Sequence, residues 1–166
     1  MILVMACGNR LRRDDGAGLL LAEKLERLFL GRRLKVRRIA VQQLTPELAE
    51  IIACAEVSEV VFVDARFIAT GGDKHKIEVQ QLYVGIVSPS LGHHMDPAAL
   101  MLYTCHLYNK KPRAWKISVP GSDFGHGEGL SGAARQAISE AADEVAAKML
   151  YFFGHSAGSE NFQSVH

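Results

Sequence analysis

Three carboxylates and a pair of histidines are the residues of this chain whose types could do chemistry. Asp14 and Asp15 stand side by side near the start, Asp64 directly follows a continuously apolar run, and His93 and His94 are adjacent. Carboxylates with an imidazole can hold a divalent metal such as nickel, zinc, manganese or iron, with positions left for a substrate group or water. A carboxylate can also act as a general acid or base. The sequence therefore holds the parts of such a site, if the fold brings them together.

The first aspartates lie in a segment that predicts a strand, a loop and a helix. Residues 2–5 are apolar, the chain then breaks at Gly8-Asn9, and the aspartates follow. From residue 16 to 30 the apolar side chains recur at helical spacing, which predicts a helix with one apolar face. Asp14 could N-cap that helix, and from the residues alone either aspartate could face a ligand.

The rest of the chain alternates strand and helix patterns. Strands are predicted over residues 34–41, 57–63, 77–84 and 115–119, and helices over 45–55, 96–108 and 131–153. Thr45, Asp96 and Ser131 are the predicted N-caps of these helices. Alternation of this kind predicts a three-layer α/β domain with a mostly parallel sheet. The link before the fourth strand is too short for a crossover helix, so that strand is antiparallel or lies at an edge.

The expected topology brings distant residues to one crevice. If the first and third strands are neighbours, strand order reverses between them, and ligands of open α/β sheets bind at such a point beyond the carboxyl ends of the strands. The loop with Asp14 and Asp15 and the end of the third strand with Asp64 then converge. The plain structural alternatives are that Asp64 caps a neighbouring helix and that His93-His94 belongs to an ordinary polar loop.

Composition narrows the classes of protein. The chain has 166 residues, a net charge of +1 and 48% hydrophobic residues, which fits one soluble domain over residues 1–153 with a polar, disordered tail over 154–166. No basic stripe with aromatics suggests nucleic acid, and no apolar run is long enough to span a membrane. The three cysteines are widely spaced and no signal peptide is visible, so we expect a cytoplasmic, reduced protein.

Several common catalytic motifs are absent from the sequence. It contains no P-loop and no HExxH, and the segment at residues 6–18 does not have the GxGxxG spacing of a dinucleotide fingerprint. Cys7 could act as a nucleophile, but it directly follows an apolar strand, and buried packing is the favoured interpretation. The carboxylates and histidines therefore remain the main candidates.

One family combines these features. The segment GN-x-L-x-x-D-D-G-x-G at residues 8–18, an apolar strand ending in Asp64-Ala65 and a loop histidine ahead of a helix resemble the nickel-iron hydrogenase maturation endopeptidases. The resemblance extends over residues 1–153. It implies a five-stranded mixed sheet between helices, with strands in the order 2-1-3-5-4 and strand 4 antiparallel. It also implies removal of a C-terminal extension from a hydrogenase large-subunit precursor after nickel insertion.

The resemblance also implies roles for individual residues. Asp15, Asp64 and His94 match the positions that contact the metal, and Asp15 and Asp64 are the catalytic candidates. His94 is favoured over His93 because the stretch from His94 to Pro112 matches the family's spacing. The nickel would come with the substrate, so no permanently bound cofactor is expected.

Two segments depart from the family pattern. Ala6-Cys7 stands where the family usually has glycine, and Gln42-Gln43-Leu44 replaces a glycine-rich turn after the second strand. These departures are typical of a divergent subgroup. Two alternatives stay open from the residues themselves: a small-molecule or peptide metallohydrolase on the same scaffold, and a non-catalytic metal-dependent binding module.

Overall fold

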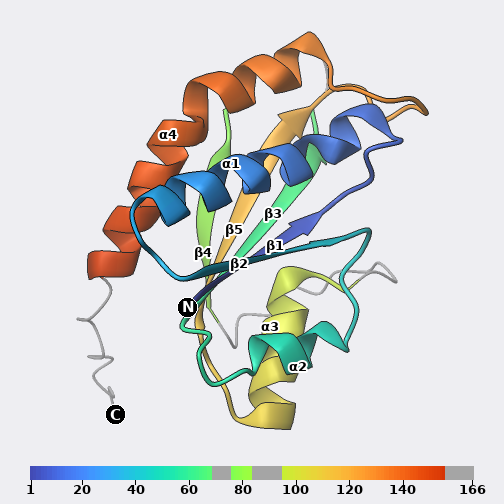
Figure 1. Cartoon of the computed structure of the whole chain (residues 1–166). Coiled ribbons are helices and arrows are strands. Elements are labelled where there is room, and N and C mark those ends of the chain that lie inside the picture. The colour runs from blue at the N-terminus through green and yellow to red at the C-terminus, as the bar shows by residue number, and fades with distance from the viewer. Residues whose placement is uncertain (69–75, 84–94, 156–166) are drawn as a thin grey trace, which may run out of the picture.

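A five-stranded sheet forms the middle layer of the molecule (Figure 1). The computed structural model describes residues 1–68, 76–83 and 95–155. The strands lie in the order β2-β1-β3-β5-β4, parallel throughout except that β4 is antiparallel to β5. Their bounds are β1 Ile2–Cys7, β2 Val36–Val41, β3 Glu59–Phe67, β4 Glu78–Leu82 and β5 Arg113–Gly121. The predicted fold class, strand order and strand direction are confirmed.

Helices cover both faces of this sheet. The helices α1 and α4 pack on one face, and α2 and α3 pack on the other (Figure 1). A short 3-10 helix, η1, precedes α1. The bounds are η1 Arg13–Gly16, α1 Ala17–Gly31, α2 Leu48–Ile52, α3 Pro97–Tyr108 and α4 Gly132–His155. The sheet is thus the middle of three layers, as the alternating pattern predicted.

Strand β1 and the first half of β3 are apolar, apart from the buried Glu59 that begins β3, because helices cover them on both sides. All six residues of β1 are buried, and so are the first five of β3. A parallel strand in this position has no wet face, so its sequence is a continuous apolar run instead of an alternating one. Each face of the sheet then carries its own core, one shared with α1 and α4 and the other with α2 and α3.

Two of the predicted helix caps are confirmed. The Asp96 carboxylate accepts a hydrogen bond from the backbone N–H of Ala99 at 2.7 Å, with Pro97 at the first helical position of α3. The Ser131 hydroxyl accepts one from the backbone N–H of Ala134 at 3.2 Å at the start of α4. Both caps satisfy backbone donors that a helix start leaves unpaired.

The predicted helix over residues 45–55 is wrong in its bounds. Only Leu48–Ile52 is α-helical, and Thr45 does not cap it with its side chain. The backbone N–H groups of Leu48 and Ala49 bond the carbonyls of Thr45 and Pro46, at 3.1 and 3.0 Å. These are i to i+3 bonds, which form tighter turns than an α-helix. The helical segment is therefore shorter than its composition suggested.

Several other bounds also differ from the predictions. The strand predicted to end at Asp64 continues to Phe67, because residues 64–67 pair with β5. The strand predicted over residues 115–119 spans Arg113–Gly121, and the last helix continues to His155. The remaining tail and the His93-His94 pair lie outside the described residues. Within the described ranges, no helix is both long enough and apolar enough to cross a bilayer.

Candidate active site at the carboxyl edge of the sheet

Asp15 and Asp64 line one pocket of about 510 Å³. The pocket lies beyond the carboxyl ends of β1 and β3, beside the start of α3. Its other lining residues come from the segment after β1, the turn after β2, the central strands and the start of α3: Cys7, Gly8, Arg12, Gln42, Gln43, Leu44, Phe62, Met95, Asp96, Pro97 and Lys116. The predicted convergence of the two carboxylates at the reversal of strand order is thus what the structure shows.

Strand alternation places three polar side chains on the same face of the sheet. Phe62 packs in the core on the α2 and α3 side, so Asp64, two residues further along β3, faces that side too. Lys116 is paired in register with Phe62 on the neighbouring strand. Cys7 lies two residues after Met5, which belongs to the same core, so Cys7 faces that side as well. The pocket therefore gathers a carboxylate, an amine and a thiol from three adjacent strands.

The environment of Asp64 raises the pKa of its carboxyl group. Burial is the largest cause, and the negative charge of Asp15 adds to it. A hydrogen bond from the backbone N–H of Ala65, at 2.8 Å, and the positive charge of Lys116 act in the opposite direction. A raised pKa makes the carboxylate a better proton acceptor than an ordinary aspartate.

Cys7 is held in its protonated form. Burial, followed by the charges of Asp64 and Asp15, raises the pKa of its thiol to about 12. A thiol acts as a nucleophile through its thiolate. The structure therefore supports the interpretation of Cys7 as a packed residue at the edge of the pocket.

The loop after β1 is shaped by Gly8. Its φ is +141°, and a Cβ atom there would lie 2.0 Å from the backbone carbonyl oxygen of Asp15. Only glycine allows this backbone path and this close approach. The following 3-10 turn, Arg13–Gly16, carries both aspartates. Gly8 thus fixes where the turn, and with it Asp15, meets the pocket.

Asp14 has a separate, structural role. It is fully buried, and its carboxylate accepts hydrogen bonds from the backbone N–H groups of Ser122, Asp123 and Ser131, at 2.9, 3.0 and 2.7 Å. Burial alone would raise its pKa, but these bonds outweigh it and lower the pKa. Asp14 therefore orders the loop between β5 and α4, and it makes no side-chain cap to α1.

Sequence reasoning missed Lys116. It lies within a strand, and its place beside Asp64 depends on the register between β3 and β5, which the local sequence does not encode. Lys116 is a charged residue between two apolar ones, Trp115 and Ile117, and this charge was the signal that the sequence offered.

The third predicted metal contact, His94, lies outside the described residues. It is bonded directly to Met95, which lines the pocket. Among the residues that the structure describes, no group of three or more histidine, cysteine or acidic side chains is arranged to hold a metal.

Comparisons with known proteins match the fold to one group of enzymes. No family model matches the sequence, and no curated protein is significantly similar to it. Among solved structures, the NiFe hydrogenase maturation protease HycI from Thermococcus kodakarensis is 22% identical, with a TM-score of 0.61 over 88% of this chain and 90% of that one. The maturating endopeptidase HybD from E. coli is 16% identical, with a TM-score of 0.62 over 91% and 93%.

The chain has the fold of the NiFe hydrogenase maturation proteases. HybD from T. kodakarensis adds a third match, with 18% identity and a TM-score of 0.57 over 89% of this chain and 97% of that one. Each match extends over at least 88% of both chains, so the likeness is to the fold of the whole domain. At these identities it is the fold that is shared.

Proposed function

We propose that this protein is an endopeptidase that removes a C-terminal extension from a nickel-loaded hydrogenase large-subunit precursor. The observation that carries the proposal is the meeting of Asp15 and Asp64 in one pocket, on the fold of the maturation proteases. Both residues stand where the family resemblance assigns metal contacts. The proposed place of action is the cytoplasm.

The substrate's nickel would be recognised by Asp15, Asp64 and His94. The chemistry of this set fits the ion, because carboxylates and an imidazole are hard and borderline ligands that suit nickel, while the substrate's thiolates hold it tightly. Two carboxylates from separate segments already line the pocket, and so does Met95, the residue that follows His94 in the sequence. The protease would thus sense metal loading and need no metal of its own.

The carboxylates also supply the chemistry of hydrolysis. The pKa of Asp64 is raised, so its ionised form is suited to take a proton from an attacking water. Cys7 stays a thiol and takes no part as a nucleophile. The Lys116 ammonium shares the pocket, where a positive charge favours the negative oxygen that forms on a carbonyl under attack.

The test uses a large-subunit precursor from the same organism, with and without nickel. Intact mass measurement after incubation should show loss of a C-terminal peptide only from the nickel-loaded precursor. Binding without shortening would favour the metal-dependent binding module instead. Hydrolysis of simple peptides without any precursor would favour the metallohydrolase.

A further inference from the structure

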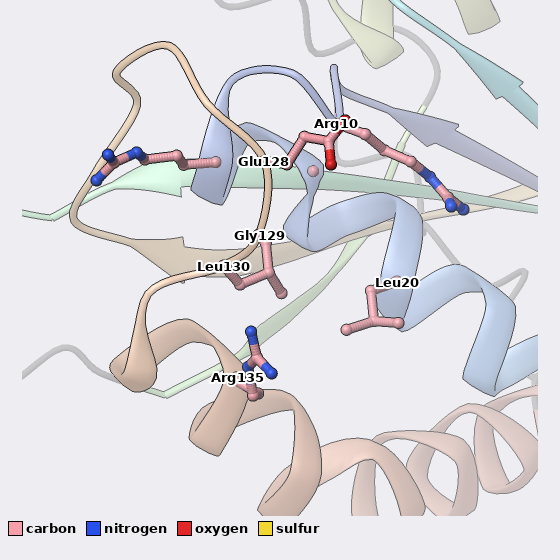
Figure 2. Close-up of a pocket in the computed structure, with 8 residues that line it drawn as sticks. Arg10, Leu20, Glu128, Gly129, Leu130 and Arg135 are labelled. Atoms are coloured by element: carbon pink, nitrogen blue, oxygen red, sulfur yellow. The ribbon is translucent and has the colours of Figure 1, made fainter.

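A second pocket, of about 520 Å³, lies on the other side of the 3-10 turn Arg13–Gly16, which carries Asp14 and Asp15. Figure 2 shows it between the start of α1, the loop after β5 and the start of α4. Its lining combines three arginines, one glutamate, two leucines and two glycines: Arg10, Arg13, Arg135, Glu128, Leu20, Leu130, Gly16 and Gly129. The proposed hydrolysis uses none of these side chains.

The lining of this pocket is positive, with three arginines against the single carboxylate of Glu128, and Figure 2 shows the guanidinium of Arg10 directed away from that of Arg135. Arg10 pairs with Glu23 and Arg13 with Asp123, but the two arginine side chains are 67% and 47% exposed. Exposed ion pairs of this kind contribute little and can exchange for another acidic partner. Arg135 is exposed, and no ion pair to it occurs within the described ranges.

Figure 2 shows the guanidinium of Arg135 pointing into the space below Leu130 and Gly129, with Leu20 on the opposite wall. Both leucines are only partly buried and pack against the core below. An apolar wall beside a guanidinium fits the last residue of a peptide, because its side chain can pack on the leucines while the arginine binds its carboxylate.

The two pockets are adjacent along the backbone. Asp15 lines the first pocket and Gly16 lines the second. Their Cα atoms are separated by about 3.8 Å, and an extended peptide spans about 3.3 Å or more per residue. The two pockets thus meet at one peptide bond, and a short extension that starts at the carboxylates of the first pocket would cross the turn to end in the second.

We propose that this arginine pocket binds the terminal carboxylate of the substrate's C-terminal extension, with an apolar last side chain against Leu20 and Leu130. The proposal rests on the proposed function, because it places the far end of the segment that is cut off. It would let the enzyme measure the distance from the cleavage site to the end of the chain.

Direct binding is tested with short peptides and the isotope-labelled full-length protein. The probe is acetyl-Ala-Ala-Leu with a free carboxylate, and its C-terminal amide and inorganic phosphate are the comparison ligands. The free acid should shift the NMR signals of Gly129, Leu130 and the Arg135 side chain, and the amide should bind about tenfold more weakly or worse. Equal binding of acid and amide, or tighter binding of phosphate than of the acid, would overturn the proposal.

The variant Arg135→Gln separates this pocket from the rest of the surface. It should weaken binding of the free acid by about tenfold, since a charged hydrogen-bond partner is lost. Arg37→Gln is the matched control, because Arg37 is an exposed arginine on β2 and its replacement changes the net charge equally. Equal effects of both variants would mean that the peptide acid is held by general electrostatic attraction, and this result would refute the proposed carboxylate site. A melting curve for each variant checks the fold.

Processing of the precursor distinguishes the two proposals. If Arg135→Gln raises KM for the precursor and leaves kcat nearly unchanged, both stand. If the wild type cuts the precursor and Arg135→Gln has the same KM, the arginine pocket is wrong and the endopeptidase remains. If the peptide acid binds as expected but no precursor is ever shortened, the endopeptidase fails and the carboxylate site remains.

Discussion

Asp14 and Asp15 are neighbours in the chain, yet the structure gives them different tasks. The 3-10 turn directs Asp15 to the pocket with Asp64, and Asp14 to three backbone donors of the loop before α4. The family motif was sufficient to select Asp15, and not Asp14, as the aspartate that lines the pocket. The donors to Asp14 could not, because they lie more than 100 residues away in sequence and depend on the tertiary fold.

Replacing Asp14 tests its structural role. Asp14→Asn should lower the free energy of unfolding by about 2 kcal/mol or more, because an amide offers fewer acceptors and its NH₂ group faces backbone donors. The pKa of Asp14 is lowered in the folded protein, so its contribution is present at neutral pH and is lost as the pH falls through the folded pKa. The gap between wild type and variant should therefore narrow in acid.

Urea unfolding of both proteins at about pH 7 and about pH 3 measures this gap. Asp143→Asn, an exposed aspartate on α4, is the control and should have little effect at either pH. A gap that stays constant with pH would show that the Asp14 carboxylate is not ionised in the way described.

Two charges near Asp64 shift the pKa of its carboxyl group in opposite directions. Lys116 lowers the pKa of Asp64 and Asp15 raises it. Lys116→Met should therefore raise the pKa of Asp64 further, and Asp15→Asn should lower it. NMR titration of the carboxyl carbons follows both changes, with Lys148→Met on α4 as the control. Shifts of the same sign in both variants would contradict the arrangement of charges.

At the scale of elements, helix α1 lies very close to the strands that carry the site. A Cβ atom at Gly18 would lie 2.9 Å from the Cα of Asp64 and 3.1 Å from the carbonyl oxygen of Cys7. The sequence showed a glycine there, but the reason for it is a contact between α1 and two strands. The extension of β3 past Asp64 was missed for a similar reason, since it depends on pairing with β5.

Gly18→Ala should destabilise the protein by about 1–3 kcal/mol, because α1 or the strand around Asp64 must shift to admit the methyl group. Gly31→Ala is the matched control at the other end of the same helix. A Cβ atom at Gly31 would meet nothing within 4 Å, so the change should be neutral or slightly stabilising. Urea unfolding of the two variants compares them. Equal stabilities would mean that the close packing at Gly18 is absent.

At the scale of the whole molecule, the order of elements was sufficient to predict the layers and the mostly parallel sheet. The full strand order came from the family resemblance, and the structure confirms both. A parallel sheet makes such prediction tractable, because its strands are continuous apolar runs and its ligand sites follow from the reversal of strand order. Residues far apart in sequence, such as Asp15 and Asp64, then meet by topology.

The central claim is that Asp15, Asp64 and His94 act together in nickel-dependent processing. The most direct test is intact mass measurement of a nickel-loaded precursor after incubation with wild type, Asp15→Asn, Asp64→Asn, His94→Ala or His93→Ala. We expect wild type and His93→Ala to release the C-terminal peptide, and the other three variants to lose at least about 100-fold in rate. Full processing by Asp15→Asn or Asp64→Asn, with melting curves showing a folded protein, would contradict the account.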